Sequence, residues 1–168
     1  MKMSPKIERA IYIGIIAVLA LLVLSFGKKQ VELQKNLPLT VEQLYKKLGN
    51  PRINLQVIDV RPYQPSEEEE DDAEDYQFYT LEHIPGSIPM PDCDLSKTPE
   101  DAKDHINFYL PTVIVSEDGN PEIFKKCAQK FKIVQNVKGG MKAWLDAGYP
   151  TEEDEYVPPK AGGGGGCL

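Results

Sequence analysis

Residues 112–122 have the sequence TVIVSEDGNPE, an apolar run followed by a short polar loop. Its β-branched run, 112–115, predicts a buried strand of the kind found in parallel sheets. The run stops at a polar loop, and Pro121 favours the start of a helix because the first helical turn needs no N–H from that residue. A strand that leads through a tight loop into a helix is typical of α/β proteins, many of which keep a nucleophile in such a loop.

The segments around this stretch alternate between strand and helix patterns. Continuous apolar runs predict strands, and amphipathic runs predict helices. Alternation of this kind predicts an α/β fold, a parallel sheet covered by helices on both faces. The expected strands cover 55–60, the second half of 82–91, 112–116 and 132–137, and the expected helices cover 39–49, 98–110, 121–131 and 139–150.

Helix ends are marked by capping residues. Thr40 with Gln43 three residues later predicts a capping box, and Thr98 predicts a second N-cap before acidic residues. Gly148, followed by Pro150, predicts the C-terminal end of the last helix.

The three cysteines, Cys93, Cys127 and Cys167, are too few and too scattered to predict a disulfide framework, and no CxxC or Cys/His cluster indicates zinc. Cys93 lies between two aspartates and is expected to be a poor nucleophile. Cys127 is expected to be a buried packing residue, because it falls on the apolar face of the helix 121–131. That face is expected to consist of Ile123, Phe124, Cys127, Ala128 and Phe131.

An uncharged apolar run occupies residues 10–27. At a rise of 1.5 Å per residue it would span about 27 Å as a helix, close to the thickness of a bilayer core. A cleaved signal peptide is the alternative, but its apolar region is usually shorter and ends at a small-x-small site. We therefore expect a head at 1–9, one transmembrane anchor at 10–27, and a linker at 28–36.

Orientation follows less directly, because three Lys/Arg residues precede the run and three follow it. A short head before a long soluble domain favours a signal anchor. This arrangement predicts a single-pass protein of a bacterial cell membrane, with its soluble domain on the extracytoplasmic (periplasmic) side.

Charge is divided unevenly between the two parts of the chain. Residues 36–168 carry 13 basic and 24 acidic residues, a net charge of −11. This field repels nucleic acid and favours a basic protein, such as a subunit of a membrane complex. Eight of the acids lie between Glu67 and Asp75, inside an expected insertion at 64–80, and their spacing lacks the ligand pattern of an EF-hand loop. No metal site and no cofactor are expected.

Four blocks of the chain carry a resemblance to a known family: VIDVR (57–61), HIPGSIPMP (83–91), the strand–loop–helix around GN (119–120), and VKGGMKAWLDAGYP (137–150). In this order and spacing, residues 37–150 resemble a rhodanese-like domain. The resemblance implies a five-stranded parallel sheet flanked by helices. It also implies a mainly structural role for Asp59, Arg61, His83, Gly86, Gly139, Gly140 and Trp144.

In active members of that family, the loop begins with a cysteine that accepts a sulfane sulfur, and often ends with an arginine. The matching positions here are Ser116 and Pro121, with Glu117, Asp118, Gly119 and Asn120 between them. A serine hydroxyl cannot carry a stable persulfide, and Pro121 supplies neither charge nor N–H. The substitutions predict a loop that is not a sulfurtransferase site. A hydrolase based on Ser116 would need a histidine partner, and nothing in the sequence pairs His83 or His105 with it.

The resulting hypothesis is a membrane-anchored, catalytically inactive rhodanese-like domain that binds or scaffolds a protein. The alternative is a redox or sulfur-handling protein that uses Cys167, which lies in the acidic, then glycine-rich tail at 151–168 and is expected to be tethered flexibly. A third possibility is a neutral or cationic small ligand held in the old pocket by the backbone N–H groups of Gly119 and Asn120.

Overall fold

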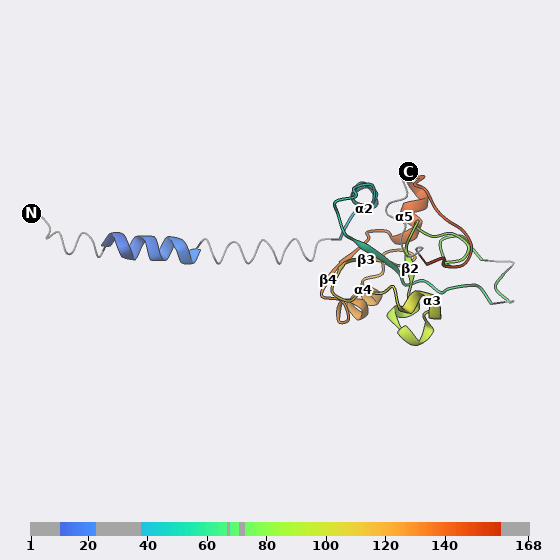
Figure 1. Cartoon of the computed structure of the whole chain (residues 1–168). Coiled ribbons are helices and arrows are strands. Elements are labelled where there is room, and N and C mark those ends of the chain that lie inside the picture. Colours follow the sequence, from blue (N-terminus) through green and yellow to red (C-terminus); the bar gives the residue numbers. More distant parts are fainter. Residues whose placement is uncertain (1–10, 23–37, 67, 71–72, 159–168) are drawn as a thin grey trace, which may run out of the picture. The chain divides into compact units, whose positions relative to one another are not determined.

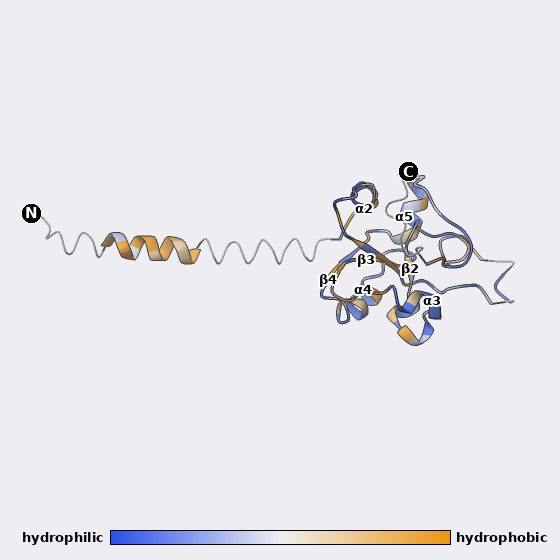
Figure 2. Cartoon of the chain, in the orientation of Figure 1, coloured by the Kyte–Doolittle hydropathy of each residue, from blue (hydrophilic) through white to orange (hydrophobic). Residues whose placement is uncertain are grey.

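The computed structural model describes residues 11–22, 38–66, 68–70 and 73–158 (Figure 1). The chain divides into two compact units, Met1–Leu37 and Pro38–Leu168. In the first unit, residues 11–22 form a helix that is largely apolar (Figure 2). Within the described residues, no helix combines the length and the apolar character needed to cross a bilayer. Residues 10 and 23–27 of the expected anchor lie outside the described part.

The second unit is built on a parallel sheet with the order β2-β1-β3-β4. Its strands are β1 (Gln56–Asp59), β2 (Ile88–Pro89), β3 (Pro111–Val115) and β4 (Ile133–Asn136). The expectation of five strands is wrong for the described residues, which form four. A fifth position is marked only by an isolated parallel bridge between Leu39 and Val137. The pairing stops there because the next residue, Thr40, already caps a helix.

The helices of this unit are α2 (Val41–Leu48), α3 (Glu100–Lys103), α4 (Pro121–Ala128) and α5 (Gly140–Asp146), with two 3₁₀ turns at Pro91–Cys93 and Leu95–Lys97. The predicted capping box is confirmed: the Gln43 N–H donates to Thr40 Oγ1 at 3.2 Å, and Gln43 Oε1 accepts from the Thr40 N–H at 3.1 Å. Gly148 is left-handed, as its predicted role requires, and directly follows the C-cap residue Ala147.

Three expectations about helices are wrong. Thr98 does not cap α3; its hydroxyl donates to the Asp94 carbonyl at 3.0 Å, and the N-cap position belongs to Pro99. The helix expected over 98–110 has only the four residues of α3. On α4, Ala128 is exposed instead of buried, because the helix turns this position away from the sheet.

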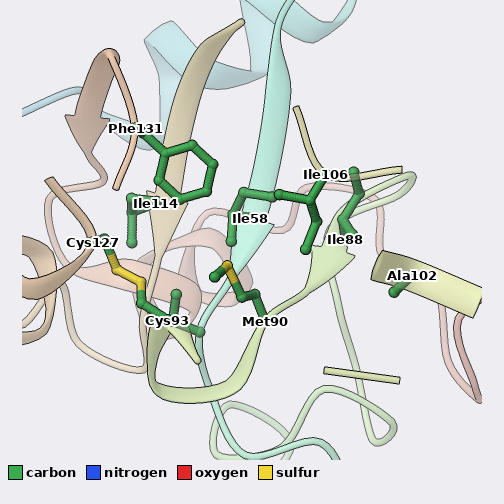
Figure 3. Packing of buried hydrophobic residues seen from close by; sticks show 10 residues of the cluster. Ile58, Ile88, Met90, Cys93, Ala102, Ile106, Ile114, Cys127 and Phe131 are labelled. Atoms are coloured by element: carbon green, nitrogen blue, oxygen red, sulfur yellow. A yellow bond between two sulfur atoms is a disulfide. The ribbon is translucent and has the colours of Figure 1, made fainter. Parts of the chain in front are cut away.

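The helices cover both faces of the sheet, as predicted: α2 and α5 lie on one side, and α3 and α4 on the other (Figure 1). Adjacent strand residues alternate between the two apolar clusters, with Val57 facing one and Ile58 the other. One cluster joins the strands to α2 and α5 through Leu44, Val57, Val113, Val115, Met141 and Trp144. The other joins them to α3 and α4 through Ile58, Met90, Ala102, Ile114, Cys127 and Phe131 (Figure 3).

A disulfide, which the sequence analysis did not predict, links Cys93 to Cys127 inside the second cluster (Figure 3). Their Cα atoms lie 5.4 Å apart although the residues are separated by 34 positions. Both residues are fully buried, which confirms the packing position expected for Cys127. The bridge ties the turn after β2 to α4.

A buried ion pair connects the first strand to the turns around it. The Arg61 guanidinium donates to both carboxylate oxygens of Asp59, and also to the carbonyls of Asp75 and Glu82 at 3.3 and 2.8 Å. Arg61 therefore holds the end of the acidic insertion and the turn before β2. Trp144 has a comparable structural place, since its indole N–H donates to the Pro150 carbonyl at 3.0 Å.

Candidate functional site

The loop that follows β3 lies at the carboxyl end of the parallel sheet, where α/β proteins commonly bind ligands. β3 ends at Val115 and α4 begins at Pro121. The six loop positions predicted from the sequence, 116–121, therefore run from the end of β3 to the first residue of α4. Ser116 is only 2% exposed, whereas Glu117 and Asp118 are exposed. The loop thus buries its first side chain and presents two acids to solvent.

The Ser116 hydroxyl is engaged within the loop. Its Oγ accepts a hydrogen bond from the Asn120 N–H at 2.9 Å, and its carbonyl accepts from the Met141 N–H at 2.8 Å. The Asn120 N–H is therefore already used, and the expectation that it could serve a ligand is wrong. The short loop satisfies its own donor with the serine oxygen.

Two left-handed glycines let the loop lie directly against α5. Gly119 has a φ of +83°, and a Cβ there would come 2.6 Å from the Val137 carbonyl oxygen. Gly140 has a φ of +58°, and a Cβ there would overlap the Ser116 carbonyl oxygen. Only glycine fits both the backbone angle and the close approach.

Side chains and main-chain donors from neighbouring elements hold the loop in this position. The Lys142 N–H donates to the Glu117 carbonyl at 3.0 Å. Asn136, at the end of β4, donates through Nδ2 to the Gly119 carbonyl at 2.8 Å. The sequence analysis did not single out Asn136, because nothing in a local pattern indicates which strand end will reach the loop.

The N-terminus of α4 is occupied by the protein itself. Asn120 Oδ1 accepts from the Glu122 N–H at 2.8 Å, and Pro121 contributes no N–H to the first turn. Helix N-termini attract anions through free N–H groups and the helix dipole. Here a carboxamide oxygen already satisfies one of these donors, which leaves a weaker anion site than an open helix terminus.

The charge around the loop is shared with the end of the acidic insertion. The Lys142 ammonium lies 5.0 Å from the centre of the Tyr76 ring. A hydrogen bond with Glu74 raises the pKa of Tyr76, and the nearby negative charge of Glu117 contributes to the same direction. The insertion and the loop therefore form one acidic region, in which Lys142 is a neighbouring cation.

Neither histidine forms a hydrogen bond to Ser116 in the described part of the chain. His83 stacks on Tyr79 with ring centres 3.9 Å apart, and its Nδ1 lies 3.0 Å from the Tyr79 carbonyl oxygen. Since a carbonyl only accepts, Nδ1 carries the proton. Burial lowers the pKa of His83, so the ring is held neutral. Because neither histidine contacts Ser116, no described histidine can act as the general base that a hydrolase nucleophile requires.

The predicted thiols also lie elsewhere. Cys93 and Cys127 form the buried disulfide. Cys167, the candidate of the redox hypothesis, lies outside the described residues. No group of three or more His, Cys, Asp or Glu side chains in the described segments is arranged to hold a metal ion.

A second concave region, which the sequence analysis missed, lies between the turn before β2 and the segment 152–158. It is a cavity of about 690 Å³ whose walls include both histidines and four consecutive acids. The acidic run after Pro150 was visible in the sequence, but was assigned to a flexible tail. The structure instead pairs Glu152 with His83 in an antiparallel bridge.

Comparison with known proteins places these observations in a family. A family model described as the Rhodanese-like domain matches residues 40–147. No curated protein matches the chain.

Three solved structures show the extent of the structural similarity. A protein from Bacillus halodurans superposes with a TM-score of 0.52 at 18% identity, covering 77% of this chain and 85% of that one. The rhodanese-like domain of an Anabaena protein gives 0.51 at 20% identity, covering 78% and 89%. A 3-mercaptopyruvate sulfotransferase from Escherichia coli gives 0.51 at 19% identity, covering 74% and 53%. At these identities the similarity concerns the fold alone.

Proposed function

The chain belongs to the rhodanese-like domain family, and we propose that it is a member that transfers no sulfur and instead binds a basic protein partner at a membrane. The observation that carries this proposal is Ser116 at the loop position where active members have a cysteine. The remaining features of the loop support the same conclusion for independent physical reasons.

The first reason concerns the nucleophile. A serine hydroxyl is not ionised near neutral pH without an adjacent base, and it cannot form a persulfide. Ser116 Oγ accepts the Asn120 N–H, and the side chain is almost completely buried. The hydroxyl therefore serves the loop's own hydrogen bonding.

The second reason concerns the anionic sulfur donor. The sixth loop position is Pro121, which offers no positive charge, and Asn120 occupies the helix terminus behind it. Glu117 and Asp118 are exposed at the rim and repel an anion. The missing nucleophile and the missing anion site both argue against sulfur transfer.

The partner is inferred from charge. The part of the chain that follows residue 35 carries a net charge of −11, and the loop rim and the acidic insertion both contribute exposed carboxylates. A field of this sign accelerates association with a basic surface and opposes binding of nucleic acid. A basic subunit of a membrane complex fits this description.

The membrane location is part of the same proposal. Residues 10–27 form an uncharged apolar run long enough to serve as an anchor. The disulfide between Cys93 and Cys127 supports an extracytoplasmic domain, because such bonds form and persist mainly in oxidising compartments. The domain would then face the partner on the outer side of the membrane.

The catalytic part is tested with the full-length protein in detergent. The protein is incubated with thiosulfate and cyanide, thiocyanate formation is followed, and the intact mass is measured. We expect background thiocyanate and no mass change, with a rhodanese-like domain that keeps its loop cysteine as the positive control. A gain of about 32 Da, one sulfur atom, on Cys167 together with turnover would replace the proposal by the redox alternative.

The binding part is tested by recovering proteins bound to the full-length chain after detergent extraction. We expect a basic protein that remains bound when Ser116 is replaced by alanine, because the hydroxyl is turned into the loop. Loss of the partner or of the biological role on Ser116→Ala would refute a purely non-catalytic role.

A further inference from the structure

The cavity between residues 79–88 and 152–158 has the properties of a binding site that the rhodanese-like loop does not have. It measures about 690 Å³ and is open to solvent along the segment 152–158. Its walls combine carboxylates, aromatic rings and a buried hydroxyl. The residues that line it include Tyr79, His83, Ser87, His105, Tyr156 and the four acids 152–155.

The acidic wall is held in place by main-chain hydrogen bonds. Glu152 and His83 exchange two of them, at 2.8 and 2.9 Å, and the Asp154 N–H donates to the Thr80 carbonyl at 2.9 Å. Two residues further on, the Tyr156 N–H donates to the Tyr63 hydroxyl at 3.1 Å. The carboxylates therefore project from a fixed backbone, and a ligand need not order this segment on binding.

The charge of the cavity is not balanced from within. Of the described residues that line it, four are acidic and none is a lysine or an arginine. Glu152 accepts from the Gly86 N–H at 3.3 Å and lies 3.8 Å from His83 Nε2. Glu153 and Glu155 form no ion pair within the described residues, and both are exposed. A cationic group is needed to complement them.

The inner wall combines aromatic rings with an unused polar group. Tyr79 stacks on His83, and Tyr156 lies 6.2 Å from the ring of His105. Ser87 is fully buried, and its hydroxyl has no hydrogen-bond partner in the described part of the chain. A buried hydroxyl without a hydrogen-bond partner is unfavourable, so a ligand that carries several N–H donors would satisfy it as well as neutralise the negative charge.

From these observations we propose that the cavity receives an arginine side chain of the partner protein. A guanidinium is planar, stacks on aromatic faces, and presents five donors that match two carboxylates and a hydroxyl. Lysine is a more strongly hydrated point charge and does not stack in this way. The inference rests on the proposed function for the existence of a basic partner, but it locates the contact away from the loop 116–121.

The proposal is tested by titrating ¹⁵N-labelled full-length protein in a zwitterionic detergent with the peptide acetyl-Gly-Gly-Arg-Gly-Gly-amide. We expect amide shifts at Gly86, Ile88 and residues 152–157, and none at Gly119 or Asn120. The same peptide with citrulline, which has the shape of arginine without its charge, should cause no shifts. The lysine peptide should bind at least threefold more weakly than the arginine peptide.

Two matched double variants separate a local site from the general negative field. Glu153→Gln/Glu155→Gln and Glu117→Gln/Asp118→Asn remove the same charge from exposed positions. The first should weaken the arginine peptide at least tenfold, and the second less than twofold. Unchanged shifts of core amides would show that both variants keep the fold.

Each contrary outcome overturns the inference. Equal weakening by the two variants, shifts centred on the loop, or equal binding of the citrulline peptide would show that the cavity is not an arginine site. None of these results would restore sulfur transfer, so the proposed function would survive them. Conversely, turnover in the thiosulfate and cyanide assay would refute the proposed function without changing the peptide titration.

Discussion

Replacing both Cys93 and Cys127 with alanine is expected to lower the free energy of unfolding by about 4 kcal/mol. The bridge closes a loop across 34 positions of sequence, and its Cα separation of 5.4 Å lies within the ordinary range for disulfides. In the chain-entropy model, closing a loop of this length lowers the conformational entropy of the unfolded chain by about 12.6 cal/mol/K. At 25 °C this raises the free energy of the unfolded state by about 3.8 kcal/mol. The main effect is therefore on the unfolded state.

The measurement is urea unfolding of the full-length protein, followed by tryptophan fluorescence. Trp144 is the chain's one tryptophan and is 1% exposed in the cluster beneath α2 and α5, so it reports on the folded domain. The wild-type protein is measured with and without a reductant. Reduction should bring its stability close to that of the double variant, whereas Cys167→Ala should leave the stability unchanged.

A thiol-alkylating reagent is added to the protein after it has been unfolded in the absence of a reductant. The reasoning is refuted if Cys93 and Cys127 react, because this would show that they are not linked. It is also refuted if the free energy of unfolding of the double variant falls by less than about 1 kcal/mol, because the disulfide would then not close the loop that the entropy model assumes. Either result would remove the support that the bridge gives to an oxidising location. A disulfide that forms only after the domain has crossed the membrane would strengthen the case for an oxidising location.

Three further predictions address the loop and the buried histidine. Ser116→Cys should leave thiocyanate formation at background in the thiosulfate and cyanide assay, because the acidic rim and the absent cation remain; turnover within tenfold of an active domain would contradict this. Gly86→Ala should lower the free energy of unfolding by about 1–2 kcal/mol through its positive φ alone. Gly140→Ala should lower it by about 2 kcal/mol more, because its Cβ also meets the Ser116 carbonyl. Equal losses of stability in urea unfolding would show that the loop can shift. Burial lowers the pKa of folded His83 below the unfolded value of 6.5, so its contribution to stability is complete above pH 6.5 and is lost as the pH falls through the folded pKa. His83→Gln should therefore reduce the difference in unfolding free energy between pH 7 and pH 5, and an unchanged difference would refute a neutral buried ring.

Local patterns predicted the elements whose ends are decided by nearby residues. The capping box of Thr40 and Gln43 and the proline at the start of α4 depend on contacts within a single turn, and both are confirmed. The buried strand at 112–115 was equally clear, because a β-branched run between polar segments leaves few other structures. These elements were sufficient to establish the α/β fold.

The helix expected over 98–110 shows where local patterns fail. It ends after Lys103 because the following residues make contacts with the sheet. The Asn107 N–H donates to Gln56 Oε1 at 3.1 Å, and Gln56 Nε2 donates to Thr112 Oγ1 at 2.7 Å. Gln56 lies 51 positions from Asn107 in the sequence, so no local window around residue 107 contains it. Tertiary hydrogen bonds outweigh the weak preference for helix.

The disulfide and the acidic cavity could not be predicted for a related reason. Burial of Cys127 follows from its helix face, but pairing with Cys93 requires the strand order that places the turn after β2 against α4. Likewise, the acids 152–155 appear in the sequence as a solvated tail, and only the pairing of Glu152 with His83 turns them into the wall of a cavity. Both features depend on topology, which composition does not contain.

The proposed function implies that the loop keeps the shape of the family's catalytic loop although its chemistry has changed. The left-handed Gly119 and Gly140 are required because the loop touches the backbone of α5, and this contact is needed whether the first side chain is a sulfur nucleophile or a serine. Ser116 can replace a cysteine within that shape because its oxygen accepts the Asn120 N–H. The side chains of Glu117 and Asp118 are exposed, so acids can occupy these two positions without disturbing the packing. On the same proposal, the substituted loop is a rigid, negatively charged surface to which a basic protein could bind.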